Sequence, residues 1–263
     1  MPPDDDRRAS DDGVLELPFA RFQEQTIDWL ELAQRRHAMY CLLEVDVSAV
    51  RSSIRARRRR TGRPLAFNAY LVACLARAID SDKRIAAVRH GRRRLLVFSD
   101  VDIALPVESD VERQAIPVPH IVRRANHKSP EAISEEISQG VEGQVPYASA
   151  RRYLRYWLLV PAFLRRLLLR AVLADARRRK RLTGTALVTA VGLPGRGRAW
   201  GVPSGTNYPV TLVIGGLRLG DDGRQTVALT LAFDHDTVNG SPAARFVRRF
   251  ARLVESGELI NQS

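Results

Sequence analysis

The chain has 263 residues, which is enough for one or two domains with a large core. Its 45% hydrophobic and 27% charged residues exclude a disordered or fibrous protein. The formal net charge of +13, carried mostly by arginine, suits an anionic partner and leaves nucleic acid, an acidic membrane surface and a phosphate-bearing ligand open.

The amino-terminal residues, MPPDDDRRASDDG, are acidic and polar and lack the apolar core of a secretory signal. We expect a disordered acidic arm over residues 1–15 and a cytoplasmic protein. The two cysteines, Cys41 and Cys74, have neither CxxC spacing nor a histidine cluster nearby. They are expected in the core, in a reducing compartment, and no metal site is predicted.

The first part of the chain alternates between helical and extended patterns. Apolar residues at helical spacing predict helices within residues 19–36 and 65–80, and an apolar run at 39–50 predicts a strand between them. The basic run at 54–64 ends in Gly-Arg-Pro, which predicts a break in regular structure. Because no aromatic residue interleaves with the arginines at 57–60, a solvated basic loop is favoured there over a nucleic-acid contact.

The next segment predicts strands and one helix. Short apolar runs predict strands of a sheet at residues 95–98, 101–107 and 114–122. Ser129 as N-cap, Pro130 in the first turn and Gly140 near the exit predict the helix that follows.

Residues 150–182 interleave leucine and aromatic residues with arginine. The longest apolar stretch, residues 157–164, contains Pro161 and is far shorter than the ~20 residues that a spanning helix needs. An amphipathic surface or subunit-interface helix pair, with arginine side chains extending to water, is favoured. Contact with an anionic membrane surface stays open as the alternative.

The last third of the chain predicts three apolar strands, at residues 185–192, 208–220 and 226–234. The third strand runs directly into His235. Beyond the Asn-Gly pair that follows, Ser241 and Pro242 open an amphipathic helix that ends before Gly257. With no internal repeat and no regular βα alternation, the order of elements predicts an α+β layered domain.

His235 is the first candidate for chemistry. A strand end fixes the position of a side chain, and a histidine, with an unperturbed pKa of about 6.5, suits a general base near neutral pH. A loop histidine is more often structural, however, and the spacing alone favours that second interpretation.

The segment LAFDHDTVNGSPAARF, residues 231–246, resembles the HxxxDG motif of the dihydrolipoyl acyltransferases, the core subunits of 2-oxoacid dehydrogenase complexes, and of chloramphenicol acetyltransferase. Asp234 before the histidine and Gly240 after the turn match as well. Other segments are similar to the family in the same order, namely LAFNAYLVACLARAI, VFSDVDIALPVE, IPVPHIVRRANHKSPEAISEEI, GTALVTAVG and YPVTLVIGGL. The resemblance covers residues 16–258 except 141–182, so an acyltransferase catalytic domain is expected over 16–263, with 141–182 as an atypical basic amphipathic insertion.

The resemblance implies a chloramphenicol acetyltransferase-like two-layer sandwich with a mixed central sheet, assembled as a homotrimer. It implies that His235 lies at a trimer interface and removes the proton from the thiol of coenzyme A or dihydrolipoamide. Thr189 stands at the position of a family serine that donates a hydrogen bond to the tetrahedral oxyanion. Coenzyme A is then a substrate, and a basic channel for this polyanion accounts for part of the arginine excess.

Two further expectations follow from the resemblance. The aspartate of HxxxDG is Asn239 here, and Arg21 stands about where the family has the arginine that pairs with it; an amide without charge makes this brace weaker. The chain carries no recognisable lipoyl domain, so a stand-alone catalytic domain is expected, with any lipoyl group on a separate partner protein.

Three functions stay open on the sequence. The first is a coenzyme A-dependent acyltransferase with His235 as base and Thr189 as oxyanion donor. The second is a weakened or inactive trimeric scaffold or regulator, with Asn239 marking the loss of activity. The third is a membrane-surface protein that acts through residues 150–182.

Overall fold

The computed structural model describes residues 22–111, 114–142, 159–191 and 199–261, with shorter pieces at 8–9, 14–17, 19 and 156–157. In the amino-terminal part, Arg8–Ala9 (β1) and Leu15–Glu16 (β2) form a short antiparallel ladder. Most of residues 1–15 lie outside the described residues, so the disordered arm stays a prediction. Arg21 also lies outside them.

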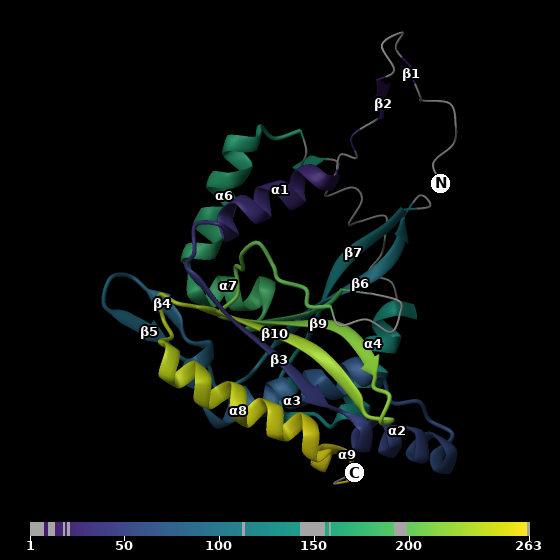
Figure 1. Ribbon diagram of the computed structural model, residues 1–263. Coiled ribbons are helices and arrows are strands. Elements are labelled where there is room, and N and C mark those ends of the chain that lie inside the picture. The colour runs from purple at the N-terminus through teal and green to yellow at the C-terminus, as the bar shows by residue number, and fades with distance from the viewer. Residues whose placement is uncertain are drawn as a thin grey trace.

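A six-stranded mixed sheet forms the centre of the molecule (Figure 1). Its strands, in spatial order, are β3 (Ala38–Asp46), β10 (Gln225–Asp234), β9 (Val210–Leu219), β8 (Ala186–Ala190), β6 (Ile103–Val111) and β7 (Gln114–Val122). The three strands β6, β8 and β9 are parallel to one another, and the other neighbours are antiparallel. The predicted α+β class with a mixed sheet is therefore confirmed.

One face of the sheet carries the main core. The helices on this side are α2 (Ser48–Thr61), α3 (Phe67–Ser81), α4 (Pro130–Glu142) and α8 (Gly240–Ser256), with the short α9 (Glu258–Asn261) after them (Figure 1). Helix α3 is buried on nearly all sides because α4 and α8 flank it, and it supplies much of the core together with Phe233, Phe246 and Phe250. Each such apolar side chain contributes ~1.5–3 kcal/mol on burial. The hydroxyl of Tyr70 on α3 donates to the carbonyl oxygens of Leu253 and Val254 and links α3 to α8.

Helices α1 (Phe22–Ala33), α6 (Ala162–Ala174) and α7 (Ala176–Thr183) lie on the other side of the sheet (Figure 1). The predicted helix pair within residues 150–182 is thus present. Asp28 on α1 is fully buried and accepts from Arg165 and Arg166 of α6, both at 2.7 Å. The expectation that the arginines extend to water is wrong for Arg165 and Arg179, which are buried. Arg165 forms ion pairs with Asp28 and Glu24 instead of hydrogen bonds to water, and Arg179 donates to the backbone carbonyl oxygen of Asn207.

The apolar face of α6 points outward instead. Its exposed side chains include Leu159 just before the helix, Phe163, Leu167 and Leu168, of which Phe163 is 74% exposed. An outward apolar face of this size is typical of an interaction surface.

The basic run at 57–60 is helical, so the expectation of a loop there is wrong. Arginine is a good helix former, and α2 continues until Gly62, which adopts the left-handed conformation with φ of 69° and ends the helix. Ser48 begins α2, which is why the strand predicted to residue 50 ends at Asp46.

Smaller differences concern element ends and pairing. Gly140 lies inside α4, while Ser129 caps that helix through the backbone N–H of Ala132 as predicted. The run at 95–98 contributes only Arg94–Leu96 (β5), which pairs with Val88–His90 (β4) in a separate small hairpin and not in the central sheet. Cys74 is buried and Cys41 is half-buried, and both thiols are free.

Candidate functional site

His235 is the first residue after β10, as the sequence predicted. Its side chain is exposed, while its backbone N–H donates to the carbonyl oxygen of His37 at 2.7 Å. His37 directly precedes the edge strand β3, which pairs with β10, so the start of β3 holds the histidine backbone at the end of β10. The position of His235 is therefore set by the sheet and not by a free loop.

The residue before the histidine, Asp234, is the best-anchored carboxylate of this region. It is buried, at 5% exposed, and accepts from Nη1 of Arg36 at 2.8 Å. Its other carboxylate oxygen accepts the backbone N–H of Asp236 at 3.1 Å, and its carbonyl oxygen accepts from Val238 at 3.0 Å. These bonds close the turn around His235, and Asp234 has Arg36 as its arginine partner.

A second contact lies on the other side of the histidine. Nδ1 of His37 is 2.8 Å from Oδ1 of Asp236, and this hydrogen bond raises the pKa of His37. His235 is thus flanked by two carboxylates, one with an arginine partner and one with a histidine partner, on residues 36 and 37.

Asn239 and Gly240 do not form the tight turn that the Asn-Gly pair suggests. The chain reverses at residues 235–237, and Asn239 is the N-cap of α8, with φ of −92° and ψ of 165°. Within the described part of the chain, the Asn239 side chain makes no hydrogen bond, so its predicted partnership with Arg21 stays a prediction. Gly240 starts α8 with open space around its Cβ position and without positive φ. Neither residue is required there by the fold of this one chain.

Thr189 lies on β8, on the face of the sheet opposite the main core. Its neighbours Ala186 and Val188 belong to the core, and successive strand residues point to opposite faces. Thr189 pairs with Val213 of β9, which pairs with Thr230 of β10. Since Thr230 is five residues before His235, the two candidate residues lie about 17 Å apart along the strand direction and about 10 Å across it. One chain therefore does not bring Thr189 and His235 together.

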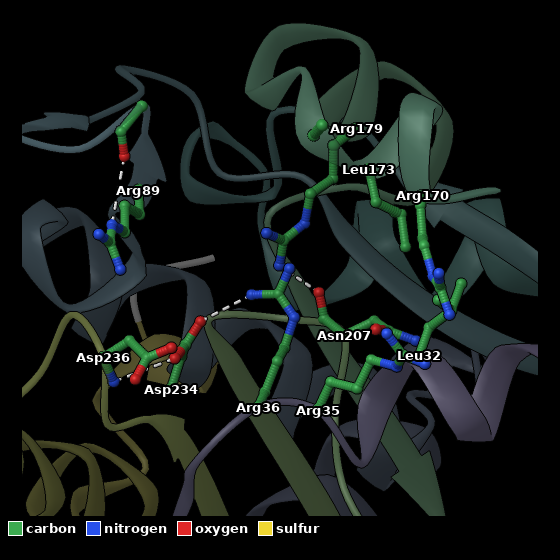
Figure 2. A pocket seen from close by; sticks show the side chains of 12 residues that line it. Leu32, Arg35, Arg36, Arg89, Arg170, Leu173, Arg179, Asn207, Asp234 and Asp236 are labelled. Carbon is green, nitrogen blue, oxygen red and sulfur yellow. Dashed lines mark hydrogen bonds and ion pairs between the residues drawn. The ribbon is translucent and has the colours of Figure 1, made fainter. Parts of the chain in front are cut away.

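A cavity of about 370 Å³ opens beside the histidine turn, and Asp234 and Asp236 form part of its wall (Figure 2). Arginine side chains from the turn after α1, from α6, from α7 and from the β4–β5 hairpin make up half of the other residues in its wall. Sequence reasoning missed these residues because they are spread from position 35 to position 179 and share no motif.

Two features are absent from the part of the chain that the structure describes. No helix there is long and apolar enough to cross a membrane. No group of three or more histidine, cysteine, aspartate or glutamate residues there could hold a metal ion.

Comparison with known proteins identifies the fold. No family model and no curated protein matches the sequence. The dihydrolipoamide acetyltransferase of Azotobacter vinelandii is similar in structure, with a TM-score of 0.68 at 16% identity, over 94% of this chain and 93% of that chain. The cubic core of the pyruvate dehydrogenase multienzyme complex matches with a TM-score of 0.65 at 17% identity, over 94% and 93%. A chloramphenicol acetyltransferase matches with a TM-score of 0.50 at 13% identity, over 95% and 99%.

The predicted resemblance is thus confirmed at the level of structure. These similarities extend over nearly the whole of each chain. The chain has the chloramphenicol acetyltransferase-like α+β fold of the dihydrolipoamide acetyltransferase catalytic domains.

Proposed function

We propose that the protein is a coenzyme A-dependent acyltransferase in which His235 is the general base. The observation that carries the proposal is an exposed histidine, anchored by its backbone at the end of β10, in the fold of acyltransferase catalytic domains. The turn bonds at Asp234 and the contact of His37 with Asp236 keep the histidine backbone in place. A base that is positioned before substrate arrives loses little entropy in the reaction.

The reaction follows from the chemistry of the groups. A thiol with pKa near ~8.5 is mostly protonated at neutral pH. His235 would take this proton, and the thiolate would attack the carbonyl carbon of an acyl thioester. When the tetrahedral intermediate collapses, the carbon–sulfur bond of the original thioester breaks and the leaving thiolate takes the proton back from the imidazolium. Coenzyme A or its acyl thioester is a substrate in this scheme.

Asn239 is compatible with an active enzyme. Work on the similar Azotobacter vinelandii enzyme concerns the role of a serine, a histidine and an asparagine four positions after the histidine in its catalytic mechanism. This chain has the same spacing from His235 to Asn239. We therefore favour acyl transfer over an inactive scaffold, with Asn239 as a positioning residue for the base.

We also propose that the active site is completed by a neighbouring subunit in a homotrimer. The distance between Thr189 and His235 within one chain supports this proposal, because an oxyanion donor must lie within about 3 Å of the oxygen that it stabilises. The similar cubic core is the core of a multienzyme complex, which is consistent with an assembled form of this chain. A cytoplasmic location fits the proposed substrate.

The decisive experiment is acyl transfer from acetyl-coenzyme A to dihydrolipoamide by the purified chain and by His235→Ala. Loss of the base should reduce kcat by ~10²–10⁴. The matched control is His90→Ala, an exposed histidine on β4 that should keep full activity. Activity of His235→Ala equal to that of the unchanged chain would remove the catalytic proposal, and inactivity of the unchanged chain with a panel of acyl thioesters would favour the scaffold.

A membrane-surface role is the second candidate, favoured by the exposed apolar face of α6. Flotation with vesicles containing anionic lipid would test it with the double variant Phe163→Glu, Leu167→Glu. The control is Leu95→Glu, an exposed leucine on the β4–β5 hairpin. Vesicle binding that is equal in the double variant and the control would exclude α6 as a membrane contact.

A further inference from the structure

The cavity beside the histidine turn is unusually rich in guanidinium groups (Figure 2). Its wall contains five arginines, Arg35, Arg36, Arg89, Arg170 and Arg179, and two carboxylates, Asp234 and Asp236. Arg179 comes from α7, Arg170 from the preceding helix α6 and Arg89 from β4, so separate elements of the chain contribute cations to one space.

Arg179 lies deepest. It is only 3% exposed, and its Nη2 donates to the backbone carbonyl oxygen of Asn207. Figure 2 shows its guanidinium directed toward that of Arg36. Burial and then the charge of Arg36 lower the pKa of Arg179 to about 10, and Asp234 offsets only part of this effect. The group is still cationic at neutral pH, in a place where its charge is costly.

The carboxylates of the cavity do not neutralise this charge. Asp234 pairs with Arg36 and Asp236 pairs with His37. Among the residues that the structure describes, the other four arginines of the cavity, Arg35, Arg89, Arg170 and Arg179, have no carboxylate within ion-pair distance. A buried guanidinium is normally paired, so Arg179 points to an anion that is supplied from outside the chain.

We propose that this cavity binds the phosphoryl group of a small molecule. A guanidinium presents donors in a fork that fits phosphate oxygens, and a phosphate dianion matches several unpaired cations better than a single carboxylate does. The volume of about 370 Å³ lies within the range of small-molecule sites and leaves room for more than a phosphate ion. Arg179 would hold the group at the floor, and the exposed Arg170 and Arg89 would close over it at the rim.

Phosphoryl binding in this cavity does not depend on acyl transfer. It bears on the neighbouring histidine, because the cavity wall includes Asp234 and Asp236, the residues on both sides of His235. A phosphoryl group bound there would place one end of its carrier molecule next to the histidine turn.

The experiment is calorimetric titration of the purified protein at constant ionic strength, with inorganic phosphate in one arm and adenosine 3′,5′-bisphosphate in the other. Arg179→Gln should weaken binding by at least about tenfold, and Arg170→Gln by a smaller factor, because each removes a charge-assisted hydrogen bond. Arg248→Gln, an exposed arginine on α8, is the matched control and should bind as the unchanged chain does. Equal affinity for both probes would identify free phosphate as sufficient, while tighter binding of the bisphosphate would identify a phosphorylated small molecule.

Two results would overturn the proposal. One is no heat of binding with either probe, beyond that of chloride at the same ionic strength. The other is that Arg179→Gln and Arg170→Gln both bind the probes as tightly as the control Arg248→Gln does, after circular dichroism has shown that all three variants are folded. If Arg179→Gln does not fold, Arg179→Lys replaces it, since it keeps the charge and loses the fork, and weaker binding of phosphate is again expected.

Discussion

A mixture of two inactive variants should regain activity if the site is shared between subunits. The two variants are His235→Ala and Thr189→Ala. The register of the sheet is the reason: Thr189 is level with Val213 and Thr230, and His235 lies five residues beyond Thr230. With ~3.4 Å per residue and ~4.8 Å per strand, the two side chains start roughly 20 Å apart in one chain. If both residues act in one site, they must therefore come from two different subunits.

The expected size of the rescue follows from trimer symmetry. The kcat of each variant alone should be lower than that of the unchanged protein, by ~10²–10⁴ for loss of the base and by ~10²–10³ for loss of the oxyanion donor. When equal amounts are mixed and reassembled at random, about three quarters of the trimers contain both variants, and each of these has one intact site out of three. The mixture should then reach about a quarter of the activity of the unchanged protein.

The assay is acyl transfer to dihydrolipoamide after unfolding and refolding the variants together, with native mass spectrometry to verify mixed trimers. Variants that are refolded separately and then combined serve as the control and should stay inactive. Thr189→Ser should keep activity by itself, since it retains the hydroxyl. Mixed trimers without recovered activity would refute the shared site, and so would an unchanged chain that is monomeric and active.

Three further predictions concern single positions. Asn239→Ala should lower kcat on the order of tenfold with little change in KM. The thermal midpoint should also change little, because the Asn239 side chain makes no cap hydrogen bond. Asn239→Asp should restore kcat, and a large loss of stability in Asn239→Ala would contradict a positioning role. Asp28→Ala should lower the free energy of unfolding by ~1–3 kcal/mol in urea denaturation, because it removes the buried carboxylate that accepts from Arg165 and Arg166 and leaves Arg165 with Glu24 as its ionic partner; a loss near zero would contradict that. The hydrogen bond that His37 donates to Asp236 raises the pKa of His37 above its ordinary 6.5, so the stabilisation by this contact should be complete below that pH and should disappear as the pH rises through the raised pKa. Its measurement is the difference in thermal midpoint between the unchanged chain and His37→Asn across this window, and a constant difference would show that the contact does not titrate there.

The local sequence pattern was sufficient to predict the strand and the helix on either side of His235. The apolar alternation of β10 and the amphipathic stripe of α8 depend on residues close together in the chain, so the strand end at His235 and the helix after it could be predicted. The helical conformation of residues 57–60 could not be predicted, because the Gly-Arg-Pro sequence that follows suggested a loop while arginine itself favours helix.

What the sequence determined by itself was therefore the order of helices and strands, the α+β class and the placement of His235 at a strand end, because periodicity is a local property of the chain. The tertiary structure alone decided which side chains meet. Arg36 and Asp234 are 198 positions apart, and their pairing follows from the antiparallel register of β3 and β10. The separation of Thr189 from His235 and the convergence of Arg179 with Arg36 likewise depend on strand register and helix packing, which no single stretch of residues encodes.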